Sequence, residues 1–411
     1  MHSVADALTH SRLVAGIVIF IASYVVFAIG KFPGMKIDRP GAAIIGAVLM
    51  VAFRVVSAET ALRAVDFATI VLLFSMMLVV ANLHLLGFFD FIAEFVVTRM
   101  GRAHLLPAVI LSTGVLSAFF VNDIICLVMV PIVLKVTRRM QMPPLPYLLA
   151  VATSSNIGSV ATITGNPQNI LIGSYSGISY PNFMAHLAPV AIVGLVIDWA
   201  ILHWMFPVTT QQPSGEIAKE TRRQLKLTKP AIVVVGVIAG FLFGLPPALV
   251  AAVGAAIMLI TRSTEPRLVY DEVDWGLLVF FVGLFIIVSG AETVGIVRGM
   301  LDIADHWNLH NTAIFTVATA VMSNIVSNVP AVMLLKSVVP GFPDPHKAWL
   351  LLAMASTLAG NLTVTGSIAN IIVVERARNE VRITFKDYLR AGVPITLLTL
   401  AFGTLWLHFI R

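Results

Sequence analysis

The sequence predicts an all-α polytopic membrane protein made of two inverted repeats. Of its 411 residues, 58% are hydrophobic and only 12% are charged, which is more apolar surface than a soluble globule of this length can bury. The second observation is an internal duplication. The third is that polar interruptions recur at matching places in the two copies. Duplication in so apolar a chain is typical of secondary transporters, whose paired repeats enclose a site near the bilayer midplane.

The duplication is visible in the residues themselves. Asp66–Gly87 reads DFATIVLLFSMMLVVANLHLLG, and 208 residues later Asp274–Gly295 reads DWGLLVFFVGLFIIVSGAETVG. The register then continues in two polar motifs, which pair SAFFVN at 117–122 with SNIVSN at 323–328, and TITGNPQN at 162–169 with TVTGSIAN at 363–370. We therefore predict a first repeat at residues 1–208, a cytoplasmic linker at 209–229 and a second, inverted repeat at 230–411.

Composition excludes several other classes of protein. The net charge is +6, but the Lys and Arg residues fall between apolar runs, where membrane topology explains them better than nucleic-acid binding does. Cys126 is the single cysteine, which excludes an internal disulfide and any multi-cysteine metal site. The first apolar run, 13–30, lacks a small-residue cleavage pattern, so we expect a retained span rather than a signal peptide.

Ten apolar runs are long enough to cross about 30 Å of hydrocarbon, five in each half. They lie near 13–30, 40–56, 67–86, 146–175 and 182–205, and near 230–244, 246–262, 275–294, 348–374 and 389–410. Each half has one further apolar stretch, near 104–136 and 310–340, with an Asn-containing break at its centre. If these two stretches are re-entrant hairpins, each half crosses an odd number of times and the second half must be inverted.

The distribution of basic residues gives an independent orientation, because short cytoplasmic loops are rich in Lys and Arg. With the N-terminus placed outside the cytoplasm, 20 of the 27 basic residues fall in inner loops and 7 in outer ones. Counting either hairpin as a full crossing would break this partition. We expect a multi-pass protein of the cell (inner) membrane with both termini extracytoplasmic.

Irregular backbone within a bilayer survives only where protein or a water-filled cavity surrounds it. The hairpin tips and the Gly- and Pro-interrupted spans at 153–169 and 356–370 are such segments, and Pro330 is expected to begin the returning helix of the second hairpin. Their exposed helix N-termini suit an anion, and their amide and hydroxyl oxygens suit sodium. The predicted substrate-binding residues are Asn122, Ser155, Asn156, Thr164, Gly165 and Asn169, with Ser323, Asn328, Thr363, Thr365, Gly366 and Asn370. For any one of them the alternative is a hydrogen bond to neighbouring backbone. None of these motifs contains Arg, so helix ends and polar dipoles are expected to meet the charge of the substrate.

Asp123 is the candidate for proton or sodium coupling, because ionisable groups at membrane depth are costly and so are functional by default. Its counterpart in the second half is Val329, and its alternative role is to cap the helix that follows at Ile124 and Ile125. Asp198 and Glu292 are expected to be structural or interfacial. Lys336 is expected to snorkel to the outer surface, and Cys126 to pack rather than bind arsenic.

The motifs resemble the ion transporter superfamily, in the branch of citrate-transporter-like proteins, arsenite permeases and D-type sodium/proton antiporters. The residues that carry this resemblance are FFVNDIICLVMVPIV at 119–133, SSNIGSVATITGNPQN at 154–169, SNIVSNVPAVML at 323–334 and TGSIANIIVVE at 365–375. The resemblance spans nearly the whole chain. It implies inverted repeats with two re-entrant hairpins, a site between their tips and the broken helices, coupling to protons or sodium, and often a homodimer with elevator-like motion.

One departure from the superfamily concerns the Ser-Asn-Thr pattern of its dicarboxylate branch. Ile157 follows Ser155 and Asn156, and Val329 follows Ser327 and Asn328. The short chain looks more like the arsenite-permease type.

The leading hypothesis is a secondary transporter of a small anion or oxyanion, either arsenite or antimonite or a carboxylate such as citrate. The alternative is a sodium/proton antiporter. No catalytic arrangement or nucleotide loop is present in the sequence, so an enzyme is not expected, and pumping driven by ATP would require a separate soluble ATPase.

Overall fold

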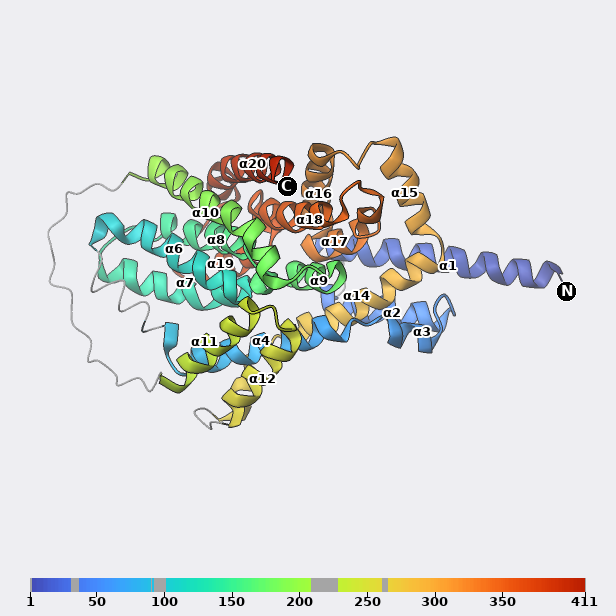
Figure 1. Ribbon diagram of the computed structural model, residues 1–411, viewed down its shortest axis with the longest axis horizontal. Helices are drawn as coiled ribbons and strands as arrows, with labels where there is room; N and C mark the ends of the chain where they lie inside the picture. The colour runs from blue at the N-terminus through green and yellow to red at the C-terminus, as the bar shows by residue number, and fades with distance from the viewer. Residues whose placement is uncertain are drawn as a thin grey trace.

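The computed structural model of the chain is all-helical and describes residues 2–30, 37–89, 91, 101–207, 228–260 and 265–410 (Figure 1). The helices of the first half are α1 (His2–Ile29), α2 (Arg39–Ala52), α3 (Ala58–Ala64), α4 (Phe67–Leu85), α6 (Leu105–Phe119), α7 (Asn122–Arg139), α8 (Leu145–Ser159), α9 (Pro167–Ser176) and α10 (Tyr180–Met205). Short 3₁₀ turns lie at η1 (Arg102–His104) and η2 (Ile163–Gly165). The predicted linker at 209–229 lies outside the described residues, apart from its last two.

The second half repeats this order of elements. Its helices are α11 (Thr228–Leu242), α12 (Pro247–Ile260), α13 (Pro266–Asp271), α14 (Trp275–Thr293), α15 (Ile296–His306), α16 (Thr312–Val326), α17 (Asn328–Leu335), α18 (Pro345–Leu358), α19 (Ile368–Ala377) and α20 (Phe385–Phe409), with 3₁₀ turns η3 (Val339–Gly341), η4 (Ala359–Asn361) and η5 (Val364–Gly366). Even local details correspond. Asp66 caps α4 and Asp274 caps α14 with their side chains, and Gly87 and Gly295 both adopt positive φ, at 76° and 81°.

Six helices in the described residues are long and apolar enough to cross a membrane: most of α1, α4, η1 with α6, α10, α14 and α20. The predicted spans at 40–56 and 246–262 form shorter helices. α2 and α12 have 14 residues each, which gives about 21 Å at 1.5 Å per residue, less than the hydrocarbon thickness of about 30 Å. The first arm of the predicted hairpin at 104–136 is itself long enough to cross.

Both expected hairpins have their break where the sequence places it. α6 and α7 pack against each other across extended backbone at Phe120 and Val121 (Figure 1). α16 and α17 pack in the same way across Ser327. Pro330 does not begin the returning helix, because α17 starts at Asn328 and Pro330 is its third residue. A proline is still tolerated there, since amides in the first helical turn lack intrahelical partners.

Both interrupted spans are broken helices. α8 ends at Ser159, and the chain continues through η2 to α9, which has Asn166 as its N-cap. In the second half α18 continues through η4 and η5 to α19, which has Ser367 in the N-cap position.

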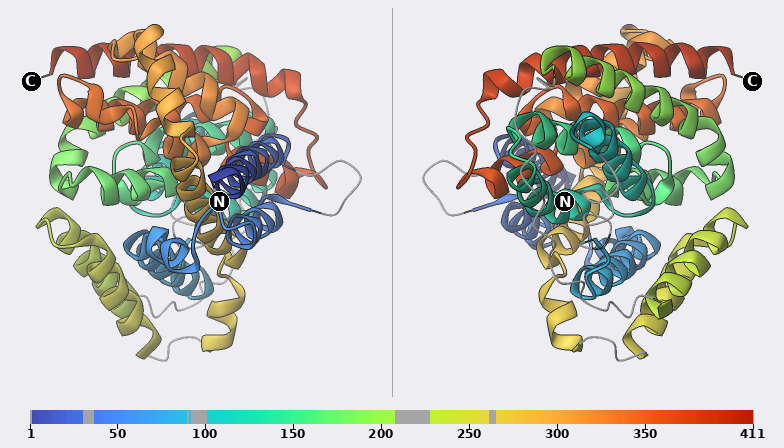
Figure 2. Two further views of the ribbon diagram at one scale, coloured as in Figure 1. Left: turned by 90° about the vertical axis from the view of Figure 1, so that its right-hand side faces the viewer. Right: turned by 90° about the vertical axis from the view of Figure 1, so that its left-hand side faces the viewer.

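The two halves interlock through exchanged contacts. α2 packs on α14 and α4 packs on α12, so equivalent elements of the two halves swap partners, while α11 and α12 lie beside α4 at the edge of the bundle (Figure 2). α10 and α20 pack against each other in antiparallel directions. Trp406 donates to the carbonyl of His186 at 2.9 Å, Gly403 lies against Val190, and Gly194 lies against Thr399.

Candidate functional site: a pocket of helix N-termini

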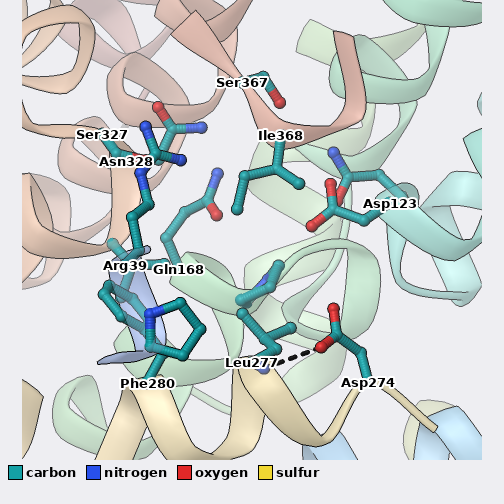
Figure 3. A pocket seen from close by; sticks show the side chains of 14 residues that line it. Arg39, Asp123, Gln168, Asp274, Leu277, Phe280, Ser327, Asn328, Ser367 and Ile368 are labelled. Carbon is teal, nitrogen blue, oxygen red and sulfur yellow. Dashed lines mark hydrogen bonds between the residues drawn. The ribbon is translucent and has the colours of Figure 1, made fainter. Parts of the chain in front are cut away.

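A pocket of about 130 Å³ lies where the hairpin tips meet the broken helices (Figure 3). Its lining residues share one property, since nearly all lie at the N-cap or in the first turn of a helix. They are Arg39 and Pro40 of α2, Asn122 and Asp123 of α7, Pro167 and Gln168 of α9, Asp274, Leu277 and Phe280 at the start of α14, Ser327, Asn328 and Val329 at the start of α17, and Ser367 and Ile368 at the start of α19.

Six helix N-termini therefore converge on one small space, three from each half of the chain. The first amides of a helix have no intrahelical acceptor, and the helix dipole adds about half a positive charge at that end. Such termini bind anions readily. The pocket can thus hold a small anionic or hydroxylated solute without a dedicated cation at every contact.

Charged side chains of both signs also line the pocket. In the view of Figure 3, Arg39 extends toward Ser327 and Asn328, while Asp123 and Asp274 lie on the other side. The Arg39 Nε donates to the Phe27 carbonyl at 2.9 Å, which ties the guanidinium to α1. One guanidinium faces two carboxylates, so the lining is net negative when both acids are ionised.

Arg39 lines the pocket although it lies outside the polar motifs from which the site was predicted. In the partition of basic residues, Arg39 counts among the 20 that fall in inner loops. A helix-start signal could have placed it correctly, because Asp38 caps α2 by accepting from Gly41 at 2.9 Å and Pro40 occupies the first turn. A capping Asp followed closely by Pro puts the residue between them at a helix N-terminus. Gln168 was also missed, although it lies within the TGNPQN motif.

Asp123 lines the pocket as predicted, but it does not cap its own helix. α7 has no side-chain cap, and the Asp123 carboxylate instead faces the backbone amide of Ala369, in the first turn of α19, which interacts with it favourably. Arg39 and Asp274 also interact with it electrostatically. A carboxylate from the first half thus sits at a helix N-terminus of the second half, where its charge is favourable.

Asn122 connects the pocket to a network of buried amides. Its Nδ2 donates to Asn156 Oδ1 at 2.9 Å, and Ser367 donates to the same oxygen at 3.0 Å. Asn156 in turn donates to Asn361 at 2.8 Å and to Asn370 at 3.0 Å. Asn122 is 3% exposed, and its own Oδ1 has no partner among the described residues. A buried amide oxygen without a partner lacks a donor or a cation, which a solute or a coupling ion in the pocket would supply.

Asn328 and Ser327 form the tip of the second hairpin. In the amide orientation that satisfies both of its polar atoms, Asn328 donates to the carbonyls of Ser356 and Gly366 at 3.1 and 3.2 Å. Ser327 has φ 78° and ψ 159°, a combination adopted almost only by glycine. The tip is therefore strained, unlike the extended residues Phe120 and Val121 of the first hairpin.

The other predicted site residues lie behind the pocket lining rather than in it. Asn169 donates to the carbonyls of Ser159 and Thr162, both at 3.0 Å, and Asn370 makes an equivalent pair of bonds in the second half. Thr164 bonds Tyr180 at 2.8 Å, Ser155 bonds Cys126 at 3.1 Å, and Thr363 bonds Asn324 at 3.2 Å. Thr365 is exposed, and the Ser323 hydroxyl is buried without a partner among the described residues.

Gly165 and Gly366 are required by close approach of backbone. A Cβ at Gly165 would overlap the Ser159 carbonyl oxygen, and one at Gly366 would lie 2.9 Å from that of Gly360. Of the predicted residues, Asn122, Asp123 and Asn328 thus line the pocket, and most of the others build the breaks that shape it.

Two further residues considered in the sequence, Lys336 and Cys126, lie outside the pocket. Lys336 pairs with Glu292 at 3.6 Å and lies 4.3 Å from the centre of the Tyr175 ring, with 17% of its side chain exposed. Its ammonium group is therefore paired and mostly buried. Cys126 is fully buried and packed in the core.

Comparison with known proteins identifies clear relatives. A model of the CitMHS family, described as citrate transporters, matches residues 24–359. The chain is 31% identical to the silicon efflux transporter LSI3 of Oryza sativa subsp. japonica, over 95% of this chain and 97% of that protein. It is 30% identical to the inner membrane protein YbiR of Escherichia coli K12, over 81% and 86% of the two chains. It is also 25% identical to the putative transporter arsB of Dictyostelium discoideum, over 90% and 87%.

Among solved structures, the YdaH transporter of Alcanivorax borkumensis is similar with a TM-score of 0.57 and 11% identity, over 97% of each chain. At that identity the likeness concerns the fold alone.

Proposed function

Because this chain belongs to the CitMHS citrate transporter family, and is therefore a multi-pass membrane transporter rather than an enzyme, we propose that it is a secondary active transporter of a small anion or oxyanion. A proton or sodium gradient drives it. The observation that carries the proposal is the convergence of six helix N-termini and Arg39 on one pocket that also holds Asp123. The family description names citrate and the rice relative is named a silicon efflux transporter, so we place silicic acid and carboxylates beside arsenite and antimonite as candidate solutes.

The charge of the pocket supports coupling to a cation. With both acids ionised, two carboxylates oppose one guanidinium, so an anion is admitted most easily when a proton or sodium ion neutralises Asp123. The unpartnered Asn122 Oδ1 beside Asp123 offers a second oxygen to such an ion. Asn156, the second-half tip and the broken helices would then fix the geometry of the loaded site.

Alternating access follows from two inverted repeats, in which the hairpins and broken helices move against the rest. The antiparallel packing of α10 on α20, which are equivalent elements of the two halves, supports inversion. The exchanged packing of α2 on α14 and α4 on α12 supports it as well.

Labelling at equivalent helix caps tests this inversion. Ser57 and Glu265 are the exposed N-cap residues of α3 and α13. Single cysteines at these sites, in a chain with Cys126 replaced by Ala, should react with a membrane-impermeant thiol reagent from opposite faces. Ser57 should react from the outside and Glu265 from the cytoplasm. Reaction of both cysteines from one face would contradict the inverted arrangement. The expected homodimer is a separate prediction, which crosslinking of the purified protein would test.

Uptake by proteoliposomes tests the transport function itself. Purified protein should accumulate at least one of arsenite, antimonite, silicic acid or citrate under an imposed pH or sodium gradient, and should not accumulate it when the gradient is collapsed. Absence of gradient-dependent flux for all four solutes would contradict the proposal. Protein-free liposomes and the Asn122→Ala variant provide the controls.

A sodium/proton antiporter is the second candidate, and the two carboxylates in the pocket favour it. Asp123 and Asp274 could bind the two cations in turn, with no anion carried. A pH-sensitive dye inside proteoliposomes separates the candidates. Proton movement on addition of sodium alone, without any of the four solutes, would support the antiporter.

A further inference from the structure

Asp198 is a buried acid that the pocket does not include. It lies within α10, is 0% exposed, and belongs to no ion pair found among the described residues. An ionised carboxylate held in protein without an opposite charge is very costly, so such a group neutralises by binding a proton or a cation.

The hydrogen bonds around Thr153 allow Asp198 to be held in either protonation state, since the hydroxyl can donate to the carboxylate or accept from the carboxylic acid. Thr153 Oγ1 lies 2.8 Å from Asp198 Oδ1 and 2.9 Å from the carbonyl of Leu149. A threonine hydroxyl has one proton to donate. If that proton goes to Leu149, the contact with Asp198 is satisfied only when the carboxyl itself carries a proton and donates it. A protonated Asp198 therefore completes both bonds.

The other carboxyl oxygen faces an incompletely bonded region. Asp198 Oδ2 and the hydroxyl of Thr396, which is 1% exposed, both lack a partner among the described residues. Because Gly403 lies against Val190 and Gly194 against Thr399, the antiparallel register places Thr396 of α20 level with Asp198. The proton of Asp198 therefore has a second position, on Oδ2, at the level of the Thr396 hydroxyl.

A chain of hydrogen bonds joins Asp198 to the pocket. The Thr153 carbonyl accepts from Asn361 at 3.1 Å, and Asn361 accepts from Asn156 at 2.8 Å. Asn156 accepts from Asn122 and Ser367, which both line the pocket. The state of Asp198 can thus influence the pocket through packed, hydrogen-bonded groups.

Few other ionisable groups lie close to Asp198. Among the helices packed against α10, α6 has none and α8 has only Tyr147. Tyr388 of α20 is the one group whose electrostatic interaction with Asp198 is found in the described residues. The remaining ionisable residues lie toward helix ends: Lys229 of α11, His346 and Lys347 of α18, Lys386, Asp387, Arg390 and His408 of α20, and Tyr180, His186 and His203 of α10 itself.

We propose that Asp198 is a second proton-binding site of this transporter, separate from the pocket and connected to it through Thr153, Asn361 and Asn156. The inference rests on the proposed function, and the ion is a proton rather than a metal cation. No group of three or more His, Cys, Asp or Glu side chains that could hold a metal occurs in the described residues, and Asp198 has one oxygen partner where a sodium ion needs several. Asp198 takes up a proton to become a neutral carboxylic acid and returns it as the network rearranges.

Infrared difference spectroscopy on the full-length protein in lipid tests the proton directly. A pH titration of the wild-type protein should show the C=O band of a protonated carboxylic acid, and Asp198→Asn should remove that band. Thr153→Val, which keeps the side-chain shape but removes the hydroxyl, should shift the band. Glu59→Gln is the control, because this glutamate lies in a surface pair with 74% of its side chain exposed. A band unchanged in both Asp198→Asn and Thr153→Val would overturn the proposal.

A transport measurement then separates a coupled proton from a permanently bound one. In proteoliposomes loaded with arsenite, efflux down its gradient should move protons in the wild-type protein, as reported by a pH-sensitive dye. Asp198→Asn should move fewer protons per arsenite, by at least about one. An unchanged ratio would overturn the coupling role even if the infrared band is present. If the wild-type protein moves no arsenite, that result counts against the arsenite assignment, and the pH titration of the band decides whether Asp198 exchanges its proton.

Discussion

Asn169 and Asn370 make the same hydrogen bonds in the two halves of the chain. Each donates its side-chain amide to the carbonyls of the residues ten and seven positions earlier, Ser159 and Thr162 in one case and Gly360 and Thr363 in the other. Both residues are fully buried. The carbonyls they satisfy belong to the interrupted helices, which have lost their regular partners there.

This relationship predicts a stability effect at both asparagines. Asn169→Ala removes two buried hydrogen bonds and leaves the carbonyls of Ser159 and Thr162 with only the longer bonds from Asn166, at 3.5 Å, and Gly165, at 3.4 Å. It should therefore destabilise the folded protein by about 1–3 kcal/mol. Asn370→Ala should behave alike. Thermal unfolding in detergent measures the effect, with Asn311→Ser as a control that keeps a helix cap at an exposed site. Normal stability combined with weakened solute binding would show instead that these amides contact the solute.

At Ser327, in contrast, we expect a substitution that increases the stability of the folded protein. Its φ of 78° with ψ of 159° is costly for any residue with a Cβ. Ser327→Gly should relieve this strain and raise stability by about 1 kcal/mol, after allowing for the greater freedom of glycine in the unfolded chain. A higher unfolding temperature for Ser327→Gly would support the strained tip, whereas a lower one would mean that the serine hydroxyl matters more than the backbone.

The hairpins, the broken helices and the polar residues near them were predictable because glycine, proline and asparagine interrupt otherwise apolar runs. The position of Arg39 in the pocket was not predictable, because a basic residue that flanks a span looks the same in the sequence whether it lies in a loop or points into a pocket. From the sequence, Asp274 was known only as the residue that matches Asp66 in the duplication, and nothing placed it in the pocket. The sequence also cannot say whether a buried amide such as that of Asn169 faces a carbonyl or a solute, because that depends on how segments far apart in the chain converge.

The asparagines at the two hairpin tips should be essential for transport. Asn122→Ala removes an amide that lines the pocket, but Asn156 still accepts from Ser367, so the fold should persist. Asn328→Ala removes the donor to two carbonyls at the other tip. We expect both variants to reach the membrane and to lose gradient-driven uptake, with Asn328→Ala also less stable because two carbonyls lose a donor. Wild-type flux in both would exclude the tips from the mechanism.

Arg39 should determine affinity for an anionic solute. Arg39→Lys keeps the charge but loses the planar guanidinium that is held by the Phe27 carbonyl. Loss of a hydrogen bond to a charged group costs about 1.5–3 kcal/mol, which corresponds to a rise of about 10- to 150-fold in KM for uptake. Arg63→Lys provides the control, because Arg63 lies on the surface, where 80% of its side chain is exposed. An unchanged KM in Arg39→Lys would mean that helix N-termini alone bind the solute.

Asp123 should set the dependence of transport on pH or sodium. Asp123→Asn keeps an oxygen that can face the Ala369 amide at the start of α19, while the group can no longer bind a proton or carry a negative charge. The flux should therefore lose most of its variation with pH when protons drive transport, or with sodium concentration when sodium does. Initial uptake rates across a series of pH values, at fixed and at zero sodium, distinguish the two cases. Asp305→Asn, with 75% of its side chain exposed, should follow the wild-type profile. If Asp123→Asn follows that profile too, the coupling ion binds elsewhere, and Asp123 serves only to contact the start of α19.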